Sequence, residues 1–179
     1  MKKFSVVFAL FAAMIFVVSC GSGSSWDDES CRTIEGLLWS SLSSRHMIWE
    51  KAVDYCENLN ECGHSDWRLP NINELRKLIR NCPGSESGGA CVVSDPDYLS
   101  PNDWSYDCFC EYIDSSLNDW DDDHYQKFFR EDGDVSLWSS SLVNDREQSA
   151  VWEVDFGSGG VYDQNDESQL FVRCVINAD

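Results

Sequence analysis

The chain has 179 residues, of which 32 are acidic and 13 are basic, so its formal net charge at pH 7 is −19. A surface this acidic repels phosphate groups, which argues against nucleic acid as a partner. It also argues against direct binding to an anionic lipid surface. Solubility or the binding of metal cations is a more natural use of such charge.

The first residues have the pattern of an export signal. Lys2 and Lys3 precede an apolar run from Phe4 to Val18, which is shorter than the roughly 20 residues of a membrane span. The run ends in Val-Val-Ser-Cys, which resembles a bacterial lipobox and implies cleavage before Cys20 and lipidation of that residue. The alternative is an ordinary signal peptide with an incidental cysteine.

This pattern divides the chain into three parts. We expect a signal peptide at 1–19, a flexible tether with an acidic lead-in at 20–33, and one domain at 34–179. Loss of the two leader lysines changes the net charge from −19 to −21. The expected location is the bacterial cell envelope, at the outer membrane or cell surface, with the lipid as the only membrane contact.

Eight cysteines follow Cys20, and an even number behind an export signal predicts four disulfides. They are Cys31, Cys56, Cys62, Cys82, Cys91, Cys108, Cys110 and Cys174. Many pairings are compatible with eight cysteines, so the connectivity stays open. We predict a local Cys82–Cys91 bridge and no bond between Cys108 and Cys110, because so short a ring is strained. Zinc is the alternative, but no second Cys/His pair has ligand spacing.

Two early segments predict a strand and a helix. The segment Leu37–Ser40 predicts a short first strand. Met47–Leu59 predicts a helix, because apolar residues recur at helical spacing and charged residues cover the other side. The apolar positions are Ile48, Ala52, Tyr55, Cys56 and Leu59. Cys56 is therefore expected near the inner face, within reach of a core sheet.

The stretch Asp66–Ile79 predicts a fixed helix start, and the chain is organised around it. Asn71 lies three residues before Glu74, which is the spacing of a capping box. The helix is expected to continue to about Arg80 with one apolar and one basic face. The apolar face carries Leu75, Leu78 and Ile79, and the basic face carries Arg76, Lys77 and Arg80.

A long irregular region and a group of strands follow. Asn81–Trp120 is rich in Gly and Pro and holds four cysteines, so we expect a loop stapled by disulfides. The later segments predict strands and a hairpin: the strand Leu137–Ser140, the strand Ala150–Phe156 with alternating apolar residues, the hairpin turn Gly157–Gly160, and the closing strand Leu170–Val175. Helices followed by strands predict an α+β domain.

The segment Trp67–Leu75 resembles the WRLPT-x-x-EL signature of the Lcl C-terminal domain family, an exported bacterial family named for a collagen-like adhesin. Three further pieces match in order: Trp49-x-x-Ala52 with Tyr55-Cys56, Trp138–Ser141 and Phe171–Val175. The resemblance covers roughly Leu37 to Val175.

The resemblance implies a C-type-lectin-like fold, shared with sulfatase-activating enzymes. That fold has two helices flanking a small twisted antiparallel sheet, with termini close together. The long disulfide-stapled loop region then falls at about Asn81 to Asp134. The resemblance also implies a disulfide between Cys56 and Cys174.

Calcium is a possible ligand, because hard cations bind closely spaced carboxylates. The candidates are Asp119, Asp121 and Asp123 in the most acidic run of the chain. The run lacks the full EF-hand pattern. Asp95-Pro96-Asp97 matches the lectin sugar-site motif only in part. A solvated acidic face is the favoured interpretation, so we expect no cofactor.

Catalysis is disfavoured. His46, His64 and His124 lie in settings typical of surface histidines. Cys174 is the only cysteine near the closing strand, and a thiol held in a disulfide is no nucleophile. No Gly-x-Ser-x-Gly elbow is present.

Binding is the favoured function. Aromatic residues among Asn and Asp suit a carbohydrate or protein ligand, and the candidates are Trp104, Tyr106, Tyr112 and Trp120. The alternative is that they form a small core for the loop. Binding of a polyanion would require a basic patch on this acidic protein. The only dense basic group in the sequence consists of Arg68, Arg76, Lys77 and Arg80. We therefore expect a lipid-anchored adhesion module; the alternatives are a structural envelope lipoprotein and, distantly, a sulfatase-modifying-factor-like enzyme.

Overall fold

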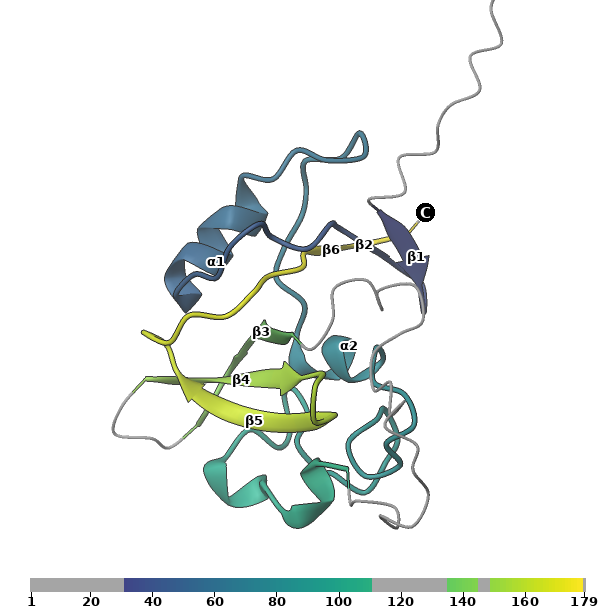
Figure 1. The fold of residues 1–179 in the computed structure, drawn as a ribbon, viewed down its shortest axis with the longest axis vertical. Coiled ribbons are helices and arrows are strands. Elements are labelled where there is room, and N and C mark those ends of the chain that lie inside the picture. The colour runs from purple at the N-terminus through teal and green to yellow at the C-terminus, as the bar shows by residue number, and fades with distance from the viewer. Residues whose placement is uncertain (1–30, 111–134, 145–148, 179) are drawn as a thin grey trace, which may run out of the picture.

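The computed structural model describes residues 31–110, 135–144 and 149–178 (Figure 1). The described residues form two three-stranded antiparallel sheets. The first has the order β1-β2-β6 and the second has the order β3-β4-β5. Their bounds are β1 Arg32–Ile34, β2 Leu37–Trp39, β6 Val175–Asn177, β3 Ser136–Leu142, β4 Ala150–Asp155 and β5 Gly160–Asn165.

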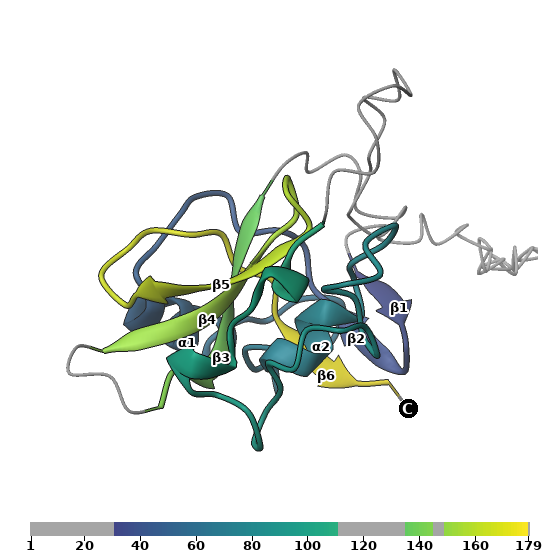
Figure 2. The ribbon, with the colours of Figure 1, turned by 90° about the horizontal axis from the view of Figure 1, so that it is seen from below.

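The described residues also form two α-helices and two 3₁₀ turns, which gives the predicted α+β class. They are α1 Trp49–Glu57, α2 Ile72–Arg76, η1 Pro101–Asp103 and η2 Tyr106–Cys108. Figure 2 shows them around the second sheet. The expectation of one small sheet is wrong, because the described strands form two separate sheets. The described ends of the chain do lie close together, since β1 and β6 both pair with β2 (Figure 1).

The two α-helices pack on opposite faces of the β3-β4-β5 sheet. Residues alternate between faces along a strand, so neighbouring positions of β4 belong to different clusters. Trp152 packs with the apolar face of α2 in one buried cluster, whereas Val151 packs with Ala52 of α1 in the other. The prediction of two helices flanking a sheet is therefore confirmed for this sheet.

The stretch Asp66–Ile79 connects the two sheets. Before the helix, the backbone of Arg68 pairs with Val175 of β6. At the helix start, the Pro70 carbonyl accepts a hydrogen bond of 2.8 Å from the Ser140 N–H of β3. The predicted capping box between Asn71 and Glu74 is present in both directions.

The second helix is shorter than predicted, and one of its basic residues is buried. Regular α-helix ends at Arg76, and bonds between residues three apart then carry Leu78 and Ile79 into the core. The Arg76 guanidinium is buried and donates to four backbone carbonyls of the following loop, so its expected place on an exposed face is wrong. The acceptors are Ser85, Glu86, Cys91 and Val93.

The predicted closing strand Leu170–Val175 is displaced, since regular β6 begins only at Val175. Serine side chains replace part of the backbone ladder before that point. The Ser43 hydroxyl accepts from the Val172 N–H at 3.0 Å, and the Ser40 hydroxyl accepts from the Cys174 N–H at 2.8 Å. These bonds hold the segment beside residues 40–43 without strand geometry.

Two described strands lie in segments for which no strand bounds were predicted, although the predicted hairpin turn Gly157–Gly160 implies a strand after it. β1 begins at Arg32, inside the segment 20–33 that was expected to be tether and lead-in. β5 follows the predicted glycine turn and pairs with β4 from Gly160 opposite Asp155 onward. The alternation of β4 is confirmed, because Ala150, Trp152, Val154 and Phe156 share one buried cluster.

Four disulfides are present, as predicted from the cysteine count. They are Cys31–Cys62, Cys56–Cys174, Cys82–Cys110 and Cys91–Cys108. The Cys56–Cys174 bond is the one that the family resemblance implied, and Cys108 and Cys110 are not bonded to each other.

The predicted Cys82–Cys91 bridge is wrong. The segment that carries Cys108 and Cys110 lies directly against the loop between Cys82 and Cys91. A Cβ at Gly84 would lie only 2.5 Å from the Asp107 carbonyl oxygen. This close approach brings both partner cysteines within bonding range, so two bridges join the two segments.

Within residues 31–110, 135–144 and 149–178, no helix has the length and apolar character that a membrane span requires.

Candidate functional site

Trp104 is the one predicted ligand-binding aromatic whose side chain the structure describes. It is half-buried and lies between η1 and η2. Its indole N–H donates to the Val161 carbonyl of the edge strand β5 at 3.0 Å, and its ring centroid lies 6.0 Å from that of Phe109. The side chain of Tyr106 and all of Tyr112 and Trp120 lie outside the described residues.

Trp104 forms one wall of an open cavity of about 510 Å³. The other lining residues come from the three strands of the second sheet. They are Ser136, Glu153, Asp155, Tyr162, Asp163 and Gln164. The cross-strand register places Tyr162 opposite Glu153 and Ser136 opposite Asp155, so these four side chains share one sheet face.

Glu153 lies at the floor of this cavity and is only 3% exposed. Burial raises the pKa of its carboxyl to about 7, and the charge of Asp155 adds to the rise against hydrogen bonds from Ser136 and Gln164. Its Oε2 is buried and has no hydrogen-bond partner among the described residues. An unsatisfied buried group costs about 1–3 kcal/mol. A ligand donor that pairs with this oxygen would therefore remove that cost.

Hydrogen bonds hold the rim of the cavity on its β4–β5 side. Asp155 accepts hydrogen bonds from the Gly157 N–H at 2.9 Å and from the Ser158 hydroxyl at 2.8 Å. The Ser158 hydroxyl also lies 3.3 Å from the Tyr162 hydroxyl. These bonds fix the turn that the glycines predicted, and with it the orientation of two lining residues.

Sequence reasoning missed most of the cavity. It identified Trp104, but not Glu153, Asp155, Tyr162 or Gln164. The only signal was the position of Glu153 on the strand face opposite the alternating apolar residues. That position is typical of a solvent-exposed residue, so it gives no warning of burial.

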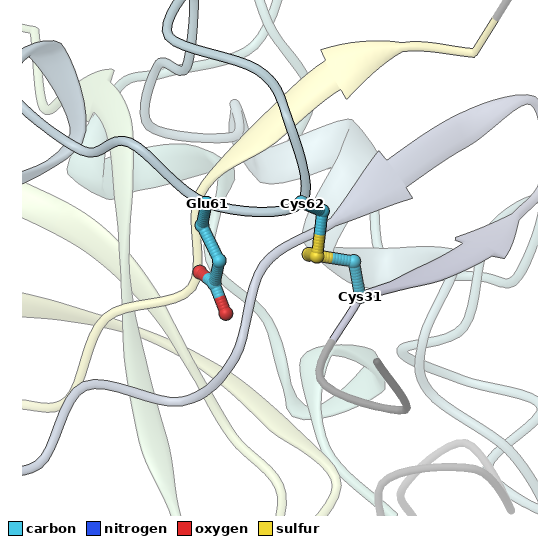
Figure 3. A group of neighbouring side chains, drawn as sticks. All are labelled: Cys31, Glu61 and Cys62. Carbon is cyan, nitrogen blue, oxygen red and sulfur yellow. A yellow bond between two sulfur atoms is a disulfide. The ribbon is translucent and has the colours of Figure 1, made fainter. Parts of the chain in front are cut away.

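The predicted calcium ligands Asp119, Asp121 and Asp123 lie outside the described residues. Within the described residues, one group has ligand atoms close enough to share a metal ion: Cys31, Glu61 and Cys62 (Figure 3). Figure 3 shows the two sulfur atoms joined in a disulfide, and a thiolate is required to bind a metal. Glu61 accepts hydrogen bonds from the backbone and hydroxyl of Ser41. The group is therefore structural.

Three of the four residues of the dense basic group are paired or buried. Arg68 makes a two-pronged ion pair with Glu74 at 2.7 and 2.8 Å, and Arg76 is buried among carbonyls. The guanidinium of Arg80 lies 3.8 Å from the carboxylate of Glu35. A polyanion would therefore meet few unpaired charges here.

None of the three described residues that were weighed for catalysis lines the cavity. Cys174 is bonded to Cys56. The ring of His46 packs 4.0 Å from that of Phe171, and His64 lies beside Trp67. The third histidine, His124, lies outside the described residues. Asp95, which belongs to the partial match to the lectin sugar-site motif, is also engaged, because its carboxylate accepts a hydrogen bond from the Ser141 hydroxyl at 2.7 Å.

Fold and site together define a small α+β domain, held by four disulfides, with an acidic and aromatic cavity on one sheet. The family model of the Lcl C-terminal domain matches residues 28–176. The chain therefore belongs to the Lcl C-terminal domain family, which suggests a surface-associated domain. A search of curated proteins found no match to the chain.

Proposed function

We propose that the chain is an exported, lipid-anchored protein of the bacterial surface whose domain is C-type-lectin-like and acts as a binding or adhesion module. The ligand is a carbohydrate or a protein, and the domain performs no catalysis. The observation that carries the proposal is the open cavity at the β3-β4-β5 sheet, with aromatic walls and converging polar groups.

Three features support this proposal. Four disulfides fit an oxidising compartment outside the cytoplasm. The apolar leader that ends at Cys20 fits export and lipidation. The Trp104 ring is held by its hydrogen bond to Val161, and a rigid ring stacks on a sugar at low entropic cost.

The test is a glycan array and a pull-down from cell surfaces with the full chain. Replacing Trp104 with alanine removes one cavity wall, so binding should fall by about tenfold, as expected for the loss of about 1–3 kcal/mol of stacking. Phe109→Ala is the matched control, since Phe109 packs on Trp104 but does not line the cavity.

Equal losses in both variants would mean that loosening of the loop, and not the cavity wall, explains the effect. If the wild-type chain binds no glycan and no surface protein, the binding function is wrong and a structural envelope role replaces it.

A further inference from the structure

The cavity contains a buried acceptor that the protein itself leaves unused. Glu153 is 97% buried, since its exposed fraction is 3%. Its Oε2 has no hydrogen-bond partner within the described part of the chain. A ligand donor at this floor pairs with the ionised carboxylate and relieves a cost that the free protein carries, so the ionised form of Glu153 favours donors over acceptors.

The surroundings favour a cationic donor. Asp155 and Asp163 line the same cavity as Glu153, and none of the described lining residues is basic. Both Asp155 oxygens are engaged with the β4–β5 turn, so this residue contributes its charge while its geometry stays fixed. The rings of Trp104 and Tyr162 add aromatic faces, which attract cations.

A bare metal ion fits this cavity poorly. Metal ligation requires carboxylate oxygens that converge on one point. Among the described residues, the only group of acidic, Cys or His ligand atoms that converge in this way is the disulfide-bonded one at Cys31. The volume of about 510 Å³ also lies in the range of organic ligands, so a cation with a molecular body fits better.

We propose that the cavity binds a glycan through the free amino group of a cationic amino sugar. The ammonium group lies over the Glu153 carboxylate between Trp104 and Tyr162. The sugar hydroxyls pair with Ser136 and Gln164, both of which are half-buried and line the cavity. This inference rests on the proposed function, and it names the class of ligand for that same site.

The experiment compares a glucosamine oligomer with its fully N-acetylated counterpart, by calorimetric titration of the full chain at pH 6.5. Acetylation removes the charge and keeps the sugar body. We expect the free-amine oligomer to bind about tenfold or more tightly, the size expected for one charge-assisted hydrogen bond. Glu153→Gln should reduce binding of the free amine to the level of the acetylated oligomer. Glu57→Gln, an exposed glutamate of α1 that does not line the cavity, should not.

Proton release gives a readout that a structural role of Glu153 would not change. Near its pKa of about 7, a large share of this carboxyl is protonated in the free protein, with Asp155, Asp163 and Tyr162 as the other titratable groups at the cavity. A bound ammonium group favours the carboxylate, so binding at pH 6.5 should release up to about three-quarters of a proton from Glu153. Titrations in two buffers of different ionisation enthalpy measure this release. Any proton that a neutral ligand amine takes up on binding reduces the net release, so the unprotonated share of the free ligand is measured at the same pH and sets the size of this correction. After this correction the release should be present in the wild type and absent in Glu153→Gln.

Tyr162→Leu tests the inference independently of Glu153, and binding of the free amine should weaken by about threefold or more. Equal binding of the two oligomers, or the absence of proton release in the wild-type chain, overturns the inference and leaves the binding function standing. Tighter binding of a lysine-rich peptide than of the amino glycan overturns the glycan as occupant. The absence of binding to any glycan or surface protein overturns the proposed function as well.

Discussion

Among the carboxyl groups of the described residues, that of Glu153 has an unusually high pKa. It is buried on the face of β4 that also carries Val151, and its pKa is raised to about 7 by burial and by the charge of Asp155. The unfolded chain ionises this group at its ordinary value of 4.5. Between these two values the folded state holds a proton that the unfolded state has released, so folding becomes less favourable as pH rises.

The pH dependence of stability tests this assignment. Glu153 should contribute stability that is fully present below pH 4.5 and is lost as pH rises to about 7, by up to about 3 kcal/mol at 1.36 kcal/mol per pKa unit. Glu153→Gln lacks this dependence. Its free energy of unfolding relative to that of the wild type should therefore be higher at pH 8 than at pH 4.5. Urea unfolding of both proteins at the two pH values measures the difference.

Glu57→Gln is the control, since this exposed residue on α1 should change stability by less than about 0.5 kcal/mol at either pH. Parallel stability curves for wild type and Glu153→Gln would contradict the assignment of a raised pKa to Glu153.

At the scale of elements, the start of α2 joins the two sheets. The chain passes from its backbone pairing with β6 to the capping box and then to β3 within a few residues. The first turn of a helix leaves backbone N–H groups without a partner inside the helix. One of them, the Ile72 N–H, donates to the Ser141 hydroxyl of the second sheet at 2.9 Å. A short helix of this length gains little from its own hydrogen bonds, and its stability depends on these attachments.

The capping box predicts a measurable loss on substitution. Asn71→Ala removes the acceptor of the Glu74 N–H, a bond of 2.9 Å, and should reduce the free energy of unfolding by about 1 kcal/mol. Asn60→Ala is the matched control, since Asn60 is exposed and precedes no helix. Thermal unfolding of both variants measures the loss. A loss of similar size at Asn60 would show that the cap contributes nothing specific.

At the scale of the whole molecule, disulfides connect segments that the two small sheets do not hold together. Cys56–Cys174 joins α1 to the end of the chain across 118 residues, whereas Cys91–Cys108 spans only 17. A longer closed loop restricts the unfolded chain more, so the first bond should stabilise the domain more than the second.

Paired alanine variants test this order. Removing Cys56–Cys174 should cost about 5 kcal/mol and removing Cys91–Cys108 about 3 kcal/mol in the chain-entropy account. Both cysteine pairs are buried, which makes the second variant a fair control for lost packing. Guanidinium unfolding measures both values. The reverse order would mean that local packing, and not closure of the long loop, determines the contribution of these bonds.

Features that depend on a few neighbouring residues were predictable from the sequence. The cap at Asn71, the alternation of β4, the glycine turn after it and the number of disulfides follow from local spacing and from an even cysteine count. The motif around Trp67 also indicated the family correctly. Each of these signals is complete within a short window or a count, so distant packing does not alter it.

Only the tertiary structure decided the partners of the six cysteines other than Cys56 and Cys174, the burial of Arg76 and Glu153, and the division into two sheets. Each depends on which distant segment lies against a residue. The loop carbonyls that surround Arg76 are brought there by chain folding, as is the segment of Cys108 and Cys110. The acidic cavity belongs to this second group, because its walls come from β3, β4, β5 and the Trp104 loop. Non-local contacts of this kind arise from packing of the whole chain and leave no periodic mark in the sequence.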